Sequence, residues 1–266
     1  MFYTEKTKFL LLFLLLLFLN SCNKNSPLDD RNWDLTFVDD FSGPILNRDV
    51  WKTNVPWGQA YNGDNQELWI DSAFRIENGV LKIEARRDTV IGMVYDENFH
   101  SLPKQFYITS GMIQSRDAFA QQYGYFEMKA KIPKGIGFWP AFWMMAYSGW
   151  PPEIDVFEIL GREPNLLHMT NHFSDDQGAH KQNAFTYPGP DFSSDFHTYG
   201  IEWDPKEITW YLDGKRVFSS KVGIPQERMY LLATFGVGGS YSGFANSSTI
   251  FPAYFEIDYI KAYKRK

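Results

Sequence analysis

Three carboxylates lie close together in the segment Trp150–Gly161, which reads WPPEIDVFEILG. Glu153 and Asp155 are two residues apart, so an extended strand directs both side chains to the same face. Glu158 follows Asp155 by three residues and would point to the opposite face, among apolar side chains. Burying an unpaired carboxylate there is strongly destabilising. The spacing therefore needs a local irregularity that brings all three acids to one open face.

A β-bulge at Val156 and Phe157 provides that irregularity. One inserted residue resets the alternation and returns Glu158 to the open face, opposite Ile154 and Val156. Bulges are common beside active sites, where they redirect a side chain. The sequence therefore predicts a bulged strand that carries three acids on one face.

Carboxyl groups that share one groove suggest glycoside hydrolysis. In retaining enzymes two carboxyl groups about 5–5.5 Å apart act as the nucleophile and as the acid and base. Repulsion among the carboxylates raises the pKa of one of them, which can then donate a proton near neutral pH. Two other interpretations of the spacing are solvated acids on an exposed strand and a calcium cluster. The apolar flanking residues, with no Asn or Ser among the acids, favour catalysis over the calcium cluster.

The N-terminal segment, MFYTEKTKFLLLFLLLLFLNSC, has the features of an export signal. Its apolar run from Phe9 to Leu19 is too short to span a bilayer but has the length of a signal-peptide core. Cys22 is the only cysteine of the chain, so no intrachain disulfide can form. LNSC resembles a bacterial lipobox, whose cysteine becomes lipid-modified at the new N-terminus. We predict a lipoprotein signal peptide over residues 1–21, lipidation of Cys22, and a protein anchored at the cell surface or in the periplasm; an ordinary signal peptide is the alternative.

The rest of the chain is expected to hold one domain. Residues 22–32 are mostly polar and are predicted to be a tether, and residues 33–266 are predicted to be the catalytic domain. The formal net charge is −6 and no basic run is present, which argues against nucleic acid and anionic lipid as partners. Aromatic residues make up 18% of the chain, which suits a sugar-binding cleft as well as a core. We expect a monomer that touches the membrane only through its lipid anchor.

Short apolar or alternating runs separated by Gly, Pro, Asn and Asp fill this domain. No stretch outside the N-terminal segment keeps helical periodicity over three turns. Residues Gly124–Ile132 alternate with period two, Asp213–Gly214 is a two-residue hairpin signal, and Glu77–Gly79 marks another turn. Many short strands with frequent turns predict an all-β sandwich of two antiparallel sheets.

Several separated segments resemble glycoside hydrolase family 16. WPPEIDVFEILG is similar to the active-site motif of the family in its bulged E-x-D-x-x-E form. Other segments resemble the family in the same order, from roughly Phe37 to Tyr263: YGYFEMKAKIPKGIGFWPAFWMM, FHTYGIEWDPKEITWYLDGK and FPAYFEIDYIKAY. The resemblance implies a β-jelly-roll sandwich with a substrate cleft on its concave face. It also implies a retaining endo-hydrolase of β-linked glucans or galactans that needs no cofactor for catalysis.

The resemblance also assigns roles that spacing alone does not. It makes Glu153 the nucleophile, Glu158 the acid and base, and Asp155 the assisting acid. The expected reaction is hydrolysis of β-1,3 or mixed β-1,3/1,4-glucan. Pro152 and Phe157 stand where many laminarin-degrading relatives have Gly and Met, which leaves the preferred linkage open. The alternatives are a galactanase of the agarase or porphyranase kind and, from another class, a carbohydrate-binding lectin without catalysis.

Three tryptophans are candidates for contact with the sugar. Trp139 and Trp143 are four residues apart, so alternation puts both on one face of a strand, either in the core or in the cleft. The resemblance places tryptophans here on the cleft wall, and Phe138 and Met144 can supply the opposite, core face. We therefore predict that both line the cleft, and that Trp150 lines its floor.

Other polar residues are candidates for the cleft. His172 follows the acid strand by one expected hairpin and either faces the cleft, where it could bond a sugar hydroxyl or Asp155, or is structural. The resemblance places Asn65 at the far end of the cleft, where Arg86 or Arg87 either reaches a hydroxyl or is a solvated strand end. The sequence predicts no site role for His168, His180 and His197.

A structural calcium site is a further implication of the resemblance. Asp258, Asp40 and the carbonyl of Gly79 resemble the ligands of a calcium site on the convex face of many family members. Such a site would lie far from the cleft and would stabilise the fold rather than take part in catalysis.

Overall fold

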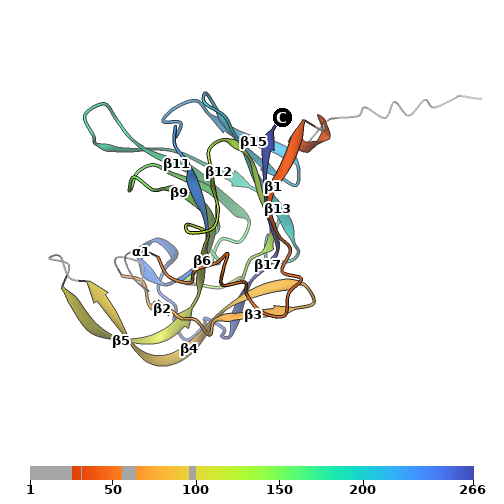
Figure 1. Ribbon diagram of the computed structural model, residues 1–266. Helices are drawn as coiled ribbons and strands as arrows, with labels where there is room; N and C mark the ends of the chain where they lie inside the picture. The colour runs from red at the N-terminus through yellow and green to blue at the C-terminus, as the bar shows by residue number, and fades with distance from the viewer. Residues whose placement is uncertain (1–25, 31, 56–63, 96–99) are drawn as a thin grey trace, which may run out of the picture.

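The structure, a computed structural model, describes residues 26–30, 32–55, 64–95 and 100–266 (Figure 1). The predicted signal peptide, Cys22 and the first part of the tether lie outside these ranges. Strands dominate the described residues; the helical elements assigned there are the 3-10 helix η1 (Pro27–Asp30) and the helix α1 (Gly239–Ser242). Within the same ranges, no helix has the length and apolar character needed to cross a bilayer.

Two sheets form the domain. The larger sheet has ten strands among the described residues: β1 (Trp33–Asp39), β2 (Glu67–Trp69), β3 (Phe74–Glu77), β4 (Val80–Tyr95), β5 (Ser101–Ser110), β8 (Gly124–Lys131), β13 (His197–Trp203), β14 (Ile208–Leu212), β15 (Lys215–Ser220) and β17 (Ala253–Arg265). The smaller sheet has seven: β6 (Met112–Gln114), β7 (Ala120–Gln121), β9 (Phe138–Ala146), β10 (Glu153–Glu158), β11 (Leu166–Ser174), β12 (His180–Pro188) and β16 (Met229–Val237). The predicted two-sheet all-β architecture is confirmed.

The order of strands places the acid strand inside the smaller sheet. The order of that sheet is β12-β11-β10-β9-β16-β6, and β7 also pairs with β16. In the larger sheet the order is β15-β14-β13-β8-β17-β4-β5-β2, with β1 on β17 and β3 on β4. Pairing is antiparallel except between β2 and β5, which run parallel. β4 and β5 form a long curved hairpin at the bottom of Figure 1, which the sequence did not predict.

The two predicted turns are tight and left-handed. Asn78 and Gly79 have φ values of 54° and 75° between β3 and β4, and Asp213 and Gly214 have 48° and 74° between β14 and β15. Two successive residues with positive φ are the mark of a type I′ turn, whose twist matches that of an antiparallel hairpin. Both turn predictions are therefore confirmed.

The predicted bulge is present in β10. The register with β9 shifts between Asp155 and Phe157, and the register with β11 shifts between Asp155 and Glu158. The extra residue puts Val156 and Phe157 together in the main core, where they are 2% and 0% exposed. Glu158 consequently lines the same cavity as Glu153 and Asp155.

A tryptophan of the facing sheet supports the bulge from the core side. The indole Nε1 of Trp210, on β14, donates a 2.8 Å hydrogen bond to the backbone carbonyl of Asp155. A bulge disrupts the ladder of backbone hydrogen bonds, and a buried carbonyl without a donor is costly. Trp210 is fully buried, so it links the core directly to the strand that carries the acids.

Replacing Trp210 with Phe is expected to lower the free energy of unfolding by about 1–3 kcal/mol, because the carbonyl of Asp155 loses its donor. Urea unfolding measures this loss. Trp203→Phe is the matched control, since its buried indole donates to the carbonyl of Pro225 at 3.1 Å, away from the acids. Only the Trp210 variant should also lower the rate of the catalysis that the sequence predicts for the acids. Equal rates in the two variants would show that the bulge needs no support from Trp210.

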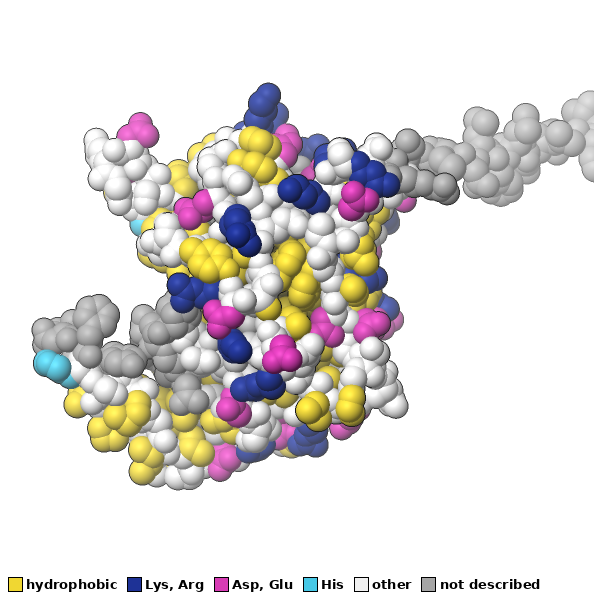
Figure 2. Space-filling view, in the orientation of Figure 1, with side chains coloured by type: hydrophobic (Ala, Val, Ile, Leu, Met, Phe, Trp, Pro, Cys, Tyr) yellow, Lys and Arg dark blue, Asp and Glu magenta, His cyan; other side chains and the backbone are white. Residues whose placement is uncertain are grey.

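The face of the molecule in Figure 2 carries acidic and basic side chains interspersed with one another. No basic patch of the kind that binds nucleic acid gathers among the described residues on this face.

Candidate active site

The three acids line a cavity of about 330 Å³ on the face of the smaller sheet that lies away from the core. Aromatic rings form much of the cavity wall: Trp69, Trp139, Trp143, Trp150, Phe185 and Tyr241. Strands β9, β10, β11, β12 and β16 all contribute lining residues. Flat aromatic rings around carboxylates suit a site that holds a sugar ring and acts on the bond beside it.

Glu158 is held by a tryptophan. The indole Nε1 of Trp139 donates a 2.9 Å hydrogen bond to Oε1 of Glu158. Burial, followed by repulsion from Asp155, raises the pKa of Glu158 well above its usual value, and the bond from Trp139 partly opposes that rise. A carboxyl group with a raised pKa remains protonated toward neutral pH and can serve as a proton donor.

Glu153 lies in a similarly buried environment. Burial is the largest cause of its raised pKa, followed by repulsion from Asp155 and Glu158. A hydrogen bond from Trp150 acts in the opposite direction and stabilises the ionised form. Glu153 and Glu158 therefore hold less negative charge between them than two isolated glutamates would hold at the same pH.

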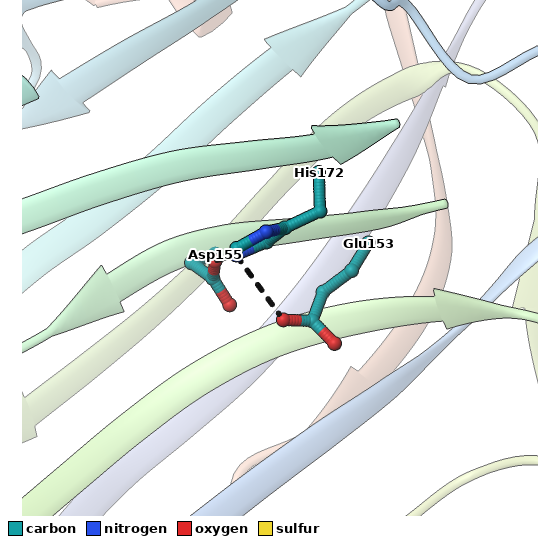
Figure 3. A group of neighbouring side chains, drawn as sticks. All are labelled: Glu153, Asp155 and His172. Carbon is teal, nitrogen blue, oxygen red and sulfur yellow. Dashed lines mark ion pairs between the residues drawn. The ribbon is translucent and has the colours of Figure 1, made fainter. Parts of the chain in front are cut away.

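Asp155 and His172 complete the cluster, as Figure 3 shows. Nε2 of His172 lies 3.2 Å from Oδ2 of Asp155 and 3.6 Å from Oε1 of Glu153. The Asp155 carboxylate is buried, and its Oδ2 has no aligned hydrogen-bond donor among the described residues. Catalytic hydrogen bonds are often poorly aligned before substrate binds and tighten in the complex. The imidazole is therefore placed to bond either carboxylate after a small rotation.

The tryptophans predicted for the cleft all line it. Trp139 is half-buried and Trp150 is 51% exposed, so both offer ring surface to a ligand. Trp143 is 6% exposed and belongs to a second apolar cluster, and its Nε1 lies 3.3 Å from the hydroxyl of Thr234. Trp143 thus combines the two alternatives: it forms the cleft floor and is packed in a small core beneath that floor.

Of the other residues predicted for the cleft, two line the cavity and one does not. His172 and Asn65 line the cavity. The amide of Asn65 donates at 3.1 Å to Glu67, a buried acid whose pKa is raised to about 8 by burial. The structure does not bring Arg86 there: its guanidinium bonds Glu84 and Asp88, and it lines a separate open pocket. Glu84 and Asp88, two residues before and after Arg86, hold its guanidinium. The prediction that Arg86 lies in the cleft is therefore wrong.

Two histidines without a predicted role also line or adjoin the cavity. His168 pairs with Glu158 across β10 and β11, and its Nδ1 lies 3.0 Å from the hydroxyl of Thr186. His180, on β12, lies 2.9 Å from Nδ1 of His172. His168 is four residues before His172 on the same strand, so alternation could have placed these two on one face; the place of His180 depends on the register of β11 with β12.

The residues predicted to hold calcium approach one another through the register of three strands. β1 and β17 pair up to Asp39 and Ile260, and β4 pairs with β17 up to Leu81 and Ile257, which brings Asp40 and Gly79 toward Asp258 in the middle of β17. The Asp258 carboxylate, however, already holds the ammonium of Lys129 at 2.7 Å. A calcium ion would have to displace this cation, so these residues do not form a ready calcium site.

Replacing Trp139 with Phe is expected to extend activity to higher pH while lowering the maximal rate. The hydrogen bond from Trp139 stabilises ionised Glu158, so its loss raises the pKa of Glu158 further. A general acid must be protonated, and activity is lost as pH rises through its pKa. The pH profile of kcat/KM measures this shift. A basic limb that moves to lower pH in Trp139→Phe would contradict the assigned contact.

The chain matches known proteins over most of its length. A family model described as glycosyl hydrolases family 16 matches residues 62–260. Endo-1,3-1,4-beta-glycanase EglC of Rhizobium meliloti (strain 1021) is 32% identical over 249 residues, which cover 86% of this chain and 51% of EglC. The chain therefore spans about half the length of that relative.

Solved structures are similar as well. The laminarinase catalytic domain of Thermotoga maritima MSB8 superposes with a TM-score of 0.73 at 32% identity, covering 88% of this chain and 99% of the other. A structure from work on endo-acting O-glycanases, which prominent members of the human gut microbiota express to initiate mucin breakdown, has a TM-score of 0.80 at 27% identity, covering 88% and 92%. The bulged acid strand, the aromatic cleft and these matches lead to one conclusion: the chain belongs to glycosyl hydrolases family 16.

Proposed function

We propose that this chain is a retaining endo-β-glucanase that hydrolyses β-1,3 or mixed β-1,3/1,4 linkages in glucans. The observation that carries this proposal is the bulge of β10, which puts Glu153, Asp155 and Glu158 into one aromatic cleft. Relatives named as β-glycanase and laminarinase support the choice of glucan. No cofactor is required, because the carboxyl groups supply the nucleophile and the proton.

In the first step, the ionised carboxylate of Glu153 attacks the anomeric carbon of the sugar. Glu158 gives its proton to the glycosidic oxygen as the bond to that oxygen breaks, so the leaving chain departs as a neutral alcohol. The product is a glycosyl ester on Glu153 and an ionised Glu158. Asp155 and His172 stand beside Glu153, where they can bond the carboxylate as its charge changes.

In the second step, Glu158 acts as a base. It takes a proton from a water molecule, whose oxygen attacks the anomeric carbon and releases Glu153 as a carboxylate. Two displacements at one carbon leave the sugar with its original configuration. Glu158 is protonated again, so the enzyme returns to its starting state.

A panel of polysaccharides tests this proposal. Laminarin and barley β-glucan should yield short oligosaccharides of mixed length from early in the reaction, as expected of internal cleavage. Proton NMR of the first products should show the β-anomer before mutarotation. Release of α-anomers first, or cleavage of neither glucan, would contradict the proposed function.

Two other substrate classes belong in the same panel. A galactan such as agar tests the agarase-like or porphyranase-like alternative. Mucin O-glycans test a second alternative, which the similarity to the O-glycanase structure favours at a TM-score of 0.80. Cleavage of either one in preference to both glucans would replace the glucanase assignment while keeping the mechanism.

A lectin without catalysis is the alternative from another class. It would bind a β-glucan or galactan and release no reducing ends from any member of the panel. The raised pKa values of Glu153 and Glu158 favour an enzyme, because a binding protein gains nothing from a buried, repelling pair of acids.

We further propose that lipid on Cys22 anchors the protein to a bacterial membrane after removal of residues 1–21, with the tether of residues 22–32 separating the anchor from the domain. Cys22→Ser should move the protein from the membrane fraction to the soluble fraction of cells, because the acyl chains that hold it are lost. Fractionation followed by immunoblotting measures this. Ser26→Ala, in the same tether, is the control and should stay with the membranes. A Cys22→Ser variant that remains in the membrane fraction would rule out the lipid anchor.

A further inference from the structure

Two histidines of neighbouring strands touch beside the acids. The register of β11 and β12 pairs His172 with Gln182, two residues beyond His180, so both imidazoles lie on the cleft face. Nδ1 of His172 and Nε2 of His180 are 2.9 Å apart. The two rings are nearly parallel, with an interplanar angle of 22° and centroids 5.1 Å apart. At this distance a proton must lie between the two nitrogens, since two lone pairs would repel each other.

The other nitrogen of His172 faces two carboxylates. Nε2 lies 3.2 Å from Oδ2 of Asp155 and 3.6 Å from Oε1 of Glu153 (Figure 3). A lone pair directed at these oxygens would be repelled, so Nε2 carries the proton. In a neutral His172, Nδ1 is then the acceptor. The donor in the pair is therefore the Nε2–H of His180.

An aromatic contact fixes the ring of His180. The indole of Trp150 lies 4.5 Å from the His180 ring, at an interplanar angle of 38°. Trp150 also forms the hydrogen bond that stabilises ionised Glu153. The His180 ring thus packs against both the indole and the His172 ring, although the residue lies on the exposed edge strand of the sheet.

The charges around the pair favour the neutral form of His180. Burial lowers its pKa first, and the neighbouring His172 and Lys181 lower it further. Lys181 in turn pairs with Asp175 at 3.4 Å. Tyr230 of β16 is another titratable group that interacts electrostatically with Glu153. A neutral His180 has one N–H, which is what the contact with His172 requires.

We propose that His180 is a positioning residue for the reaction: it holds His172 in the tautomer whose Nε2–H faces Asp155 and Glu153. His180 itself touches neither acid. The N–H it holds in place stabilises the ionised form of Glu153, which is the attacking form. The predicted effect on catalysis rests on the proposed glycosidase function, whereas the predicted tautomer of His172 does not.

The tautomer can be observed without substrate. Long-range ¹H–¹⁵N NMR of the five histidines of the chain should show His172 as the Nε2–H form in the unaltered protein. His180→Phe keeps a ring against Trp150 but removes the donor, so His172 should shift toward a mixture of tautomers. His180→Gln restores a donor and should restore the Nε2–H form. Lys181→Met, on the same strand but outside the cavity lining, is the control and should leave the tautomer unchanged.

Enzyme kinetics give a second, independent test of the role of His180. His180→Phe should lower kcat/KM by roughly 10-fold, as loss of a residue that orients a functional histidine does elsewhere. The acidic limb of the pH profile of kcat/KM should move to higher pH in His180→Phe, because the ionised nucleophile loses a stabilising N–H. His180→Gln should return this limb toward its original position. A tautomer shift without any glycan cleavage by the unaltered protein would support the positioning role and overturn the proposed function. An Nδ1–H tautomer in the unaltered protein, or an unchanged tautomer in His180→Phe, would overturn the inference.

Discussion

Replacing Glu153 with Gln is expected to lower kcat by about 10⁴-fold, because an amide cannot attack the anomeric carbon to form the glycosyl ester. The substitution preserves size and removes one of three mutually repelling acids. The raised pKa of Glu153 means that its ionised form destabilises the fold at pH values above the usual carboxyl range. The variant should therefore melt at the same temperature as the unaltered protein or higher. Reducing-end release and thermal unfolding measure the two effects.

A smaller side chain gives the matched test of the role of Glu153. In Glu153→Ala, added azide can occupy the vacated space and attack the anomeric carbon, which yields a glycosyl azide of inverted configuration. Glu207→Gln, at an acid that pairs with Arg216 and lies outside the cavity lining, is the control and should keep full activity. Activity above about a tenth of the original in Glu153→Gln would exclude this residue as the nucleophile.

Replacing Glu158 with Ala is the second large effect, with an expected loss of about 10²–10⁴-fold on polysaccharides. The loss should be much smaller in the first step with an aryl glycoside, whose leaving group departs without a proton. The basic limb of the pH profile should also disappear with such a substrate, because it reports deprotonation of Glu158, the raised pKa of which comes mainly from burial. The comparison of the two substrates measures proton donation directly. An equal loss on both substrates would assign Glu158 a binding role instead.

The strands of the fold follow closely from the sequence. The alternation in Gly124–Ile132 and the signals at Asp213–Gly214 predicted β8 and the β14–β15 hairpin, because local backbone preference and burial act in the same direction there. The bulge could be predicted for the same reason: a third acid in an apolar strand has no acceptable place without it. The long β4–β5 hairpin was not predicted, since its outer half has exposed apolar residues such as Ile91, which do not follow a simple pattern of one buried face.

The site was harder to predict where it depends on contacts between strands. The acids and Trp139 belong to two neighbouring strands, and their common face could be predicted from alternation in β9 and from the bulge expected in β10. The contact between His172 and His180 depends on the register of the β11–β12 hairpin, which the sequence between them does not fix. The guanidinium of Arg86 could have bonded either a sugar hydroxyl or a neighbouring carboxylate, and the two alternatives differ only in the direction of its side chain. In the structure it bonds the carboxylates of Glu84 and Asp88, so its predicted position was wrong.

The most direct measurement of the central claim is to trap the covalent intermediate. A laminaribiosyl fluoride with a second fluorine at carbon 2 of the reacting sugar should form the glycosyl ester faster than that ester is hydrolysed, so the protein should gain the mass of one fluorinated disaccharide. Peptide mapping should place that sugar on Glu153, opposite the proton donor Glu158 in the cleft. A sugar on Glu158, or a protein that hydrolyses glucan yet never gains the label, would contradict the account.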